Sequence, residues 1–184
     1  MPDDRSRGSD LCTQCGLCCN GALHNFAKLE PEEVEYASGL GLTLRASGRP
    51  GFALPCPMLE GTLCSIYGDR PKVCSRYKCQ LLQDLEAGAV TLDAAIGKVG
   101  TAKELVRQAE TLMPEGITLP GARALSQQAP DAATDLSGRA GGMALRLAIT
   151  ALSLYIDKHF KNSREGKLLS LEPVGEGQPD TEMT

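Results

Sequence analysis

The sequence predicts a mostly α-helical protein whose first half contains irregular, cysteine-rich loops that form a small metal-stabilised module. All eight cysteines lie between residues 12 and 79, and the second half contains none. In that second half, apolar residues recur at helical spacing over two long segments. A chain of 184 residues can bury a hydrophobic core without covalent cross-links. We therefore expect the later helices to cover the module.

The first elements along the chain are short. Residues 1–10 are polar and charged, which predicts a disordered lead-in. The cysteine array that follows is too rich in Cys and Gly for a regular element. Residues 26–38 predict a helix, because Pro31 and the acidic residues after it suit a first turn and Gly39 ends it. We read Glu32, Glu33 and Glu35 as a solvated face of this helix.

Longer elements follow. Residues 42–63 contain several Pro and Gly, and they predict loops with one hairpin. A helix is predicted from residue 70 to residue 88. The next helix, over residues 91–113, begins with Thr91 as its cap and ends at Pro114.

The end of the chain is predicted to contain one further helix. Residues 115–142 are rich in Ala, Pro, Gly and Ser, and they predict a loop or a poorly packed segment. Residues 143–160 have the strongest helical periodicity in the chain. This apolar run is short and Arg146 interrupts it, so we do not expect it to span a membrane. Residues 162–184 predict a flexible, solvated tail.

We divide the chain into four parts on this basis: a lead-in over 1–10, a metal-binding module over 11–88, a helical extension over 89–161 that packs on the module, and a tail over 162–184.

Composition excludes several classes of partner. The net charge of −4 argues against a surface that binds phosphates. With no Trp, three Phe and four Tyr, the chain has few aromatic side chains on which bases could stack. The first residues contain no apolar signal segment, which favours a reducing cytoplasm over a compartment where disulfides persist. Adjacent Cys18 and Cys19 also suit disulfide geometry poorly. We expect neither nucleic acid nor membrane as a partner.

The spacing of the first cysteines points to a metal. Cys12, Cys15 and Cys18 follow at steps of three, the C-x2-C-x2-C run that ferredoxin-type iron–sulfur proteins use. Zinc is the alternative, because four thiolates from two paired knuckles form its usual structural site. The later cysteines are spaced too irregularly to form the second closely spaced cysteine pair of such a zinc site. This favours an iron–sulfur centre without excluding zinc.

We predict that every cysteine is a metal ligand: Cys12, Cys15, Cys18, Cys19, Cys56, Cys64, Cys74 and Cys79. They would fill two four-coordinate sites or share one polynuclear centre. Cys18 and Cys19 cannot easily face one ion, so they would divide between two sites or bridge two metals. Both arrangements stay open.

Other residues have two interpretations each. His24 is a further possible ligand or simply a histidine of the core or surface. Arg70 and Arg76 could offset the charge of the thiolates or be solvated. Tyr67 and Tyr77 could shield the centre or pack against the core.

The ordered motif resembles a known family. It reads Cys12-Thr-Gln-Cys15-Gly-Leu-Cys18-Cys19, then Cys56-Pro-Met-Leu59, Cys64-Ser-Ile-Tyr67, Asp69-Arg-Pro71, Cys74-Ser-Arg-Tyr77 and Cys79. Residues 12–79 thereby resemble the CxxCxxCC family of YkgJ-like cysteine cluster proteins, described as chelating zinc or iron. The resemblance implies metal binding through the eight cysteines, and some relatives carry the domain within flagellin lysine methylases. Here Ser75 separates Cys74 from Arg76, whereas the family commonly has Arg directly after that cysteine.

We expect a metal-binding protein that holds an iron–sulfur cluster or clusters, acting in electron transfer, redox sensing or support of a partner enzyme. The alternative is a structural zinc module that mediates protein–protein interaction. The chain has no recognisable catalytic set or Gly-rich phosphate turn, so a stand-alone enzyme is disfavoured. A protein partner of unknown identity fits either function.

Overall fold

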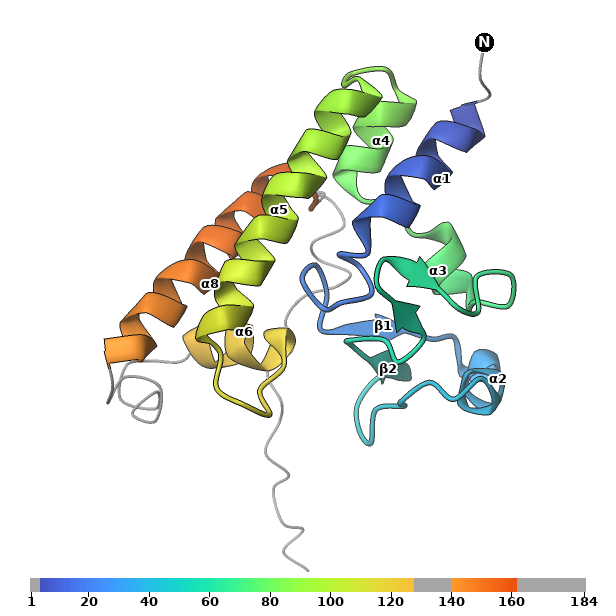
Figure 1. Cartoon of the computed structure of the whole chain (residues 1–184). Helices are drawn as coiled ribbons and strands as arrows, with labels where there is room; N and C mark the ends of the chain where they lie inside the picture. Colours follow the sequence, from blue (N-terminus) through green and yellow to red (C-terminus); the bar gives the residue numbers. More distant parts are fainter. Residues whose placement is uncertain (1–3, 128–139, 162–184) are drawn as a thin grey trace, which may run out of the picture.

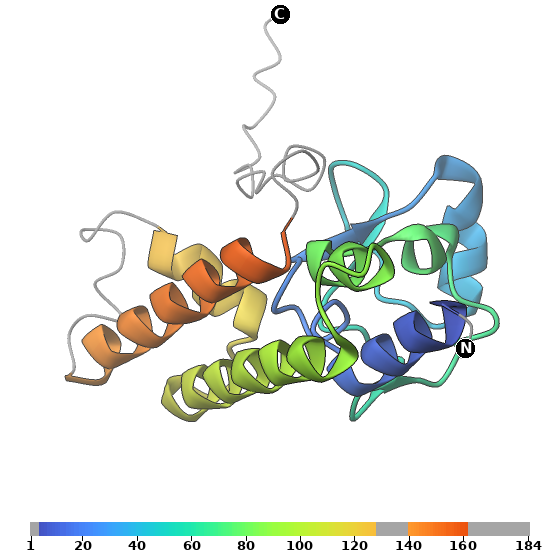
Figure 2. The same cartoon turned by 90° about the horizontal axis from the view of Figure 1, so that it is seen from above.

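Long helices and a group of short strands and helices lie on either side of the chain's cysteine-rich loops (Figure 1). The computed structural model describes residues 4–127 and 140–161. The long helices begin with α1 (Asp4–Cys15) and continue with α5 (Leu92–Leu112) and α8 (Ala140–His159). Helix α5 packs against α8 along its length and against α1 (Figure 2). The mostly helical fold class is confirmed.

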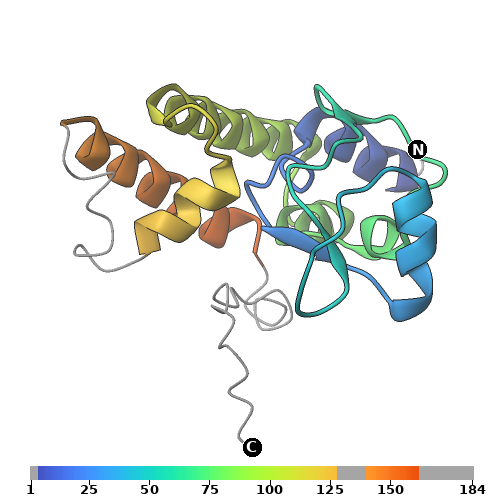
Figure 3. The same cartoon turned by 90° about the horizontal axis from the view of Figure 1, so that it is seen from below.

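Short elements form the other side of the molecule. Strands β1 (Phe26–Lys28) and β2 (Gly51–Ala53) pair in antiparallel register, with Phe26 opposite Ala53. Strands β3 (Leu59–Glu60) and β4 (Leu63–Cys64) form a hairpin. The remaining elements on this side are η1 (Pro31–Glu33), α2 (Val34–Gly39) and α3 (Lys72–Arg76). Two further short helices, α4 (Gln80–Glu86) and α6 (Leu119–Gln127), pack with the long helices. Figure 3 shows α6 lying against α8.

The buried apolar side chains of these elements form two separate hydrophobic clusters. The helical core is built from α1, α4, α5, α6, α8 and the loop after α1, with Leu17, Leu81 and Leu152 fully buried. The strand core is smaller and consists of Leu29, Ala37, Leu42, Phe52 and Leu54. Burying apolar area at about 25 cal/mol per Å² is the main stabilising term on both sides.

The two strongest helix predictions are confirmed. The Thr91 side chain accepts a hydrogen bond from the Ala94 amide at 3.2 Å and so caps α5. Along α8, Leu145, Ile149, Leu152 and Ile156 are buried at helical spacing. The opposite face of α8 exposes Met143, Leu147 and Leu154. No helix within the two described ranges combines the length and apolar character that crossing a bilayer requires.

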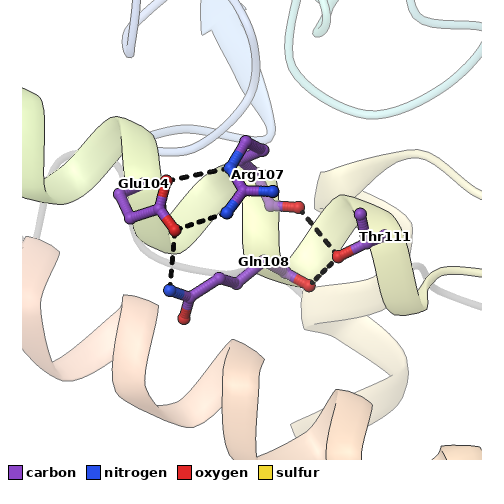
Figure 4. A network of polar contacts seen from close by, with 4 residues as sticks. All are labelled: Glu104, Arg107, Gln108 and Thr111. Atoms are coloured by element: carbon purple, nitrogen blue, oxygen red, sulfur yellow. Dashed lines mark hydrogen bonds and ion pairs between the residues drawn. The ribbon is translucent and has the colours of Figure 1, made fainter.

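The outer face of α5 is held by local polar contacts (Figure 4). Glu104 accepts two hydrogen bonds from Arg107, at 2.8 and 2.6 Å, and one from Gln108 at 2.9 Å. These contacts lower the pKa of Glu104 to about 2. The pair is exposed to water, so it contributes little to the stability of the protein.

Several predictions for the first half are wrong. Residues 4–10 and the first two cysteines lie on helix α1, where we expected a lead-in and an irregular loop. The reason is tertiary: Leu11 is buried in the helical core, and Gly8 lies close to Leu82 of α4. Residues 26–28 form a strand instead of a helix, because they pair with residues 51–53. The helix that follows begins at η1, and the hairpin is confirmed at residues 59–64.

Glu33 is also placed differently from the prediction. It is buried, and its carboxylate accepts a hydrogen bond from the Lys72 amide at 2.9 Å. This contact ties the start of α3 to η1. Only part of the predicted solvated face is therefore solvated.

Two later predictions are wrong as well. The helix expected over 70–88 is broken at Tyr77, whose ψ of 130° is extended, so α3 and α4 are separate. The segment predicted as a loop contains α6, which buries Leu119 and Ala122. Its remainder at 128–139 and the predicted tail at 162–184 lie outside the described residues. Within the four-part division, the lead-in is wrong from Asp4 onward, and the bounds of the other parts stay predictions.

Helix α6 packs directly on the loop that follows α1. Gly21 has a φ of +88°, and a Cβ there would lie 2.6 Å from Cγ of Pro120. We predict that Gly21→Ala lowers the free energy of unfolding by about 2 kcal/mol or more, through backbone strain and this clash. Urea denaturation measures the change.

Gly97→Ala is the matched control for this substitution. A Cβ at Gly97, within α5, meets nothing within 4 Å. We expect it to stabilise the protein by about 0.5–1 kcal/mol, because alanine favours a helix over glycine. Equal effects of the two variants would contradict the tight contact between Gly21 and α6.

Candidate metal centre

Helix α1 and the turn after it present the first four cysteines. Cys12 and Cys15 lie on the last turn of α1, three residues apart and hence on one face. Gly16 ends the helix with a φ of +70°, which glycine adopts without strain. Its carbonyl accepts hydrogen bonds from the amides of Cys19 and Asn20, both at 3.0 Å. This tight turn carries Cys18 and Cys19 away from the helix axis.

The other four cysteines come from the short elements. The Cys56 amide donates to the Cys19 carbonyl at 2.7 Å, which joins the two segments directly. Cys64 lies on β4 opposite Leu59 of β3. Cys74 lies on α3, and Cys79 precedes α4 in an extended conformation. The break at Tyr77 is what separates these last two cysteines into different elements.

All eight cysteines line one cavity of about 390 Å³. Most of the other lining residues are apolar, including Leu23, Phe52 and Phe160. Cys12 is the exposed cysteine among them, and the other seven are half-buried. The cavity therefore lies between the two cores and draws residues from both.

The thiols surround the cavity without converging on one point. None of the eight cysteines takes part in a disulfide. Within residues 4–127 and 140–161, no three His, Cys, Asp or Glu side chains form a group that could hold a metal ion in the conformation described. The donors are gathered, and bonds to a metal would require the thiols to move closer together, since zinc–sulfur bonds measure about 2.3 Å.

Burial is the main influence on these thiols. It raises the pKa of Cys15 and Cys74 to about 12 and that of Cys19 and Cys79 to about 11. The pKa of Cys18 is raised well above its ordinary value for the same reason, with a further contribution from neighbouring cysteines. A bound cation reverses this effect, because a thiol that coordinates a metal loses its proton.

The comparison with known families agrees with this geometry. Residues 11–95 match the model of the CxxCxxCC family, whose description is "Putative zinc- or iron-chelating domain". Residues 11–95 are a CxxCxxCC domain. The resemblance predicted from the motif is confirmed. No curated protein and no solved structure matched the chain.

Arg70 is the cation of the CxxCxxCC domain that lies among its thiols. It lines the cavity, and its guanidinium lies 3.9 Å above the centre of the Tyr67 ring. Burial raises the pKa of Cys12, Cys19 and Cys74, and the charge of Arg70 opposes that rise at each of them. Arg76 is exposed at the end of α3. Of the two predicted counter-charges, Arg70 has the suitable position.

His24 lines the same cavity, and its ring contacts Tyr77 edge-on at 4.8 Å between centroids. Its Nε2 atom is buried and has no hydrogen-bond partner among the described residues. Burial lowers the pKa of His24 to about 4, with Lys161 and Arg123 adding to the effect. The imidazole is therefore neutral at pH 7. Metal ligation by His24 stays a prediction, and Tyr77 lines the cavity as well.

Sequence reasoning missed Arg123, which lies outside the CxxCxxCC domain. Its side chain is 2% exposed and donates a hydrogen bond to the Ala22 carbonyl at 2.8 Å, with a longer one of 3.5 Å to the Gly21 carbonyl. This guanidinium therefore holds the backbone that follows Cys19. The helical spacing of Leu119, Ala122 and Arg123 was the available signal, but a composition rich in Gly and Pro obscured it.

We predict that Arg123→Met lowers the free energy of unfolding by about 1–3 kcal/mol, because it leaves buried carbonyls without a donor. The matched control is Arg107→Met on the exposed face of α5, which should leave the unfolding midpoint nearly unchanged. Urea denaturation of both variants checks this. Equal losses would mean that the contact with Ala22 does not stabilise the loop.

His24 gives the metal-free protein a specific acid sensitivity. The folded-state pKa of about 4 lies below the unfolded value of 6.5, so the unfolded chain takes up the proton first. The contribution of neutral His24 is complete above pH 6.5 and is lost as the pH falls to 4, a change of roughly 3 kcal/mol. Urea denaturation of the metal-free protein across this range measures it.

His24→Phe should flatten that part of the pH profile relative to the wild type. His159→Gln is the control, because His159 lies on the surface end of α8 and its pKa is lowered less. An unchanged slope in His24→Phe would show that the imidazole is not buried in its neutral form.

Proposed function

We propose that the CxxCxxCC domain holds iron as one or more iron–sulfur clusters. The observation that carries the proposal is the gathering of all eight cysteines around one largely apolar cavity of about 390 Å³. A single water molecule occupies about 30 Å³ of liquid, so the cavity offers far more room than a lone ion needs. The C-x2-C-x2-C spacing of Cys12, Cys15 and Cys18 also fits cluster ligation.

The surroundings of the thiols fit a redox centre. Apolar lining limits solvent access, and both solvent access and nearby charge set the reduction potential of a cluster. Arg70 provides a positive charge beside the thiolates, and Tyr67 holds its guanidinium in place. A bound cluster supplies one-electron chemistry. Within this proposal the protein transfers electrons, senses redox state or supports a partner enzyme in the cytoplasm, a reducing compartment where free thiols persist.

The alternative is a structural zinc module that mediates protein–protein interaction. An all-thiolate donor set is the usual one for structural zinc, and it is the observation that favours this alternative. In that case the metal stabilises the irregular loops, and the protein's action depends on the surface it presents to a partner.

The test is metal and acid-labile sulfide analysis of the full chain purified without oxygen, together with its visible spectrum. We expect iron with matching sulfide and broad visible absorption that reduction bleaches. Stoichiometric zinc in a colourless protein would instead establish the alternative. A protein with neither metal would contradict both.

Cys15→Ala and Thr62→Ser form the matched pair for this test, since both residues line the cavity. We expect Cys15→Ala to lower the metal content and Thr62→Ser to leave it unchanged. An equal loss in both would mean that packing of the cavity wall, and not the thiol, determines metal content.

A further inference from the structure

Five of the eight cysteines pack against one or the other of the two hydrophobic cores. Cys15, Cys18 and Cys79 pack against the helical core. Cys56 and Cys74 pack against the strand core. The cavity is therefore lined by two groups of thiols that are anchored to separately packed parts of the molecule.

The first group is held by the packing of α1 on α4. Cys12 and Cys15 share one face at the end of α1, and Cys79 immediately precedes α4. Cys18 follows in the turn after α1, beside the fully buried Leu17. These four residues, Cys12, Cys15, Cys18 and Cys79, form the helical set.

Backbone hydrogen bonds and the hairpin hold the second group. The Cys19 carbonyl accepts from the Cys56 amide at 2.7 Å, and the Cys56 carbonyl accepts from the Leu59 amide at 3.1 Å. Leu59 in turn pairs with Cys64 across the β3–β4 hairpin. Cys74 joins them from α3, which contacts β1. These four residues, Cys19, Cys56, Cys64 and Cys74, form the strand set.

The electrostatic effect of each thiol on the pKa of the others follows the same division. Burial is the largest cause of each raised pKa, and the leading contributions from other cysteines come from within the set. Those that raise the pKa of Cys18 most are Cys79 and Cys15, although Cys19 and Cys12 also contribute. For Cys19 they are Cys56 and Cys64, ahead of Cys12. For Cys74 they are Cys19, Cys56 and Cys64.

We propose that the helical set and the strand set are two separate four-thiolate metal sites, with the adjacent Cys18 and Cys19 assigned one to each. Four thiolates complete a tetrahedral zinc site and equally the ligand set of an iron–sulfur cluster. The assignment rests on the proposed metal-binding function and specifies how the eight ligands are shared. It also gives the adjacent cysteines a role that needs no bridging thiolate.

Titration of the reduced, metal-free full chain with Co²⁺ tests the division, because tetrahedral cobalt–thiolate sites have characteristic visible absorption. We expect the wild type to bind two cobalt ions. Cys15→Ala and Cys56→Ala should each bind one. The double variant within the helical set, Cys15→Ala with Cys79→Ala, should still bind one, whereas the double variant across the sets, Cys15→Ala with Cys56→Ala, should bind none.

A single shared centre predicts a different pattern. One substitution in either set would then abolish or distort all cobalt binding, which would overturn the division. Circular dichroism of each variant shows whether it folds. For any variant that does not, the cadmium-113 NMR spectrum of the Cd²⁺-loaded wild type decides. We expect two tetrathiolate resonances without coupling between them, and one resonance or cadmium–cadmium coupling would overturn the proposal.

Failure of this inference and failure of the proposed function are distinguishable. Protein purified without oxygen that contains iron or zinc, but whose substitutions abolish all cobalt binding together, retains the function and loses the division. Purified protein that contains neither metal contradicts the function itself, and the division with it.

Discussion

The gathering of eight thiols, seven of them half-buried, around one largely apolar cavity is the constraint on which the rest of the structure depends. Each thiol that loses its proton there places a negative charge in apolar surroundings, next to other thiols that do the same. Such a charge is costly unless a cation compensates it. Arg70 supplies part of this compensation, and a bound metal would add its own positive charge. The loops around the cavity pack against the two hydrophobic cores, which hold the thiols in place around it.

The two hydrophobic cores position the segments that carry the cysteines. The helical core fixes the end of α1 and the start of α4, whereas the strand core fixes α3 and the residues Met58 and Ile66 on either side of the hairpin. Residues from outside the CxxCxxCC domain take part, since Arg123 and Pro120 of α6 hold the turn at Gly21 and Ala22. The helical half of the chain therefore does more than cover the module. It sets the position of the backbone that leads out of the cysteine motif.

An element could be predicted from the sequence when the interactions that form it lie within its own segment. Helices α5 and α8 were predictable because a regular apolar face lies within each segment, and α5 also has a cap at Thr91. Helices α1 and α6 were not, because both depend on contacts with distant segments such as Leu82 and Gly21. The pairing of β1 with β2 joins residues about 25 positions apart and left no local signal. The motif predicted the cysteines as ligands, and only the fold shows that all eight line one cavity.

The single peptide bond between Cys18 and Cys19 has a thermodynamic consequence. In the proposed two-site arrangement, a metal bound by the helical set would immobilise the backbone at Cys18, and part of the conformational entropy that ordering Cys19 costs would then already be lost. A second metal would consequently bind more tightly than it would to an empty domain. Linkage would make the effect reciprocal, so loss of either metal would weaken retention of the other by the same factor. Two such sites would fill and empty cooperatively, and the domain would respond to metal supply more sharply than two independent sites.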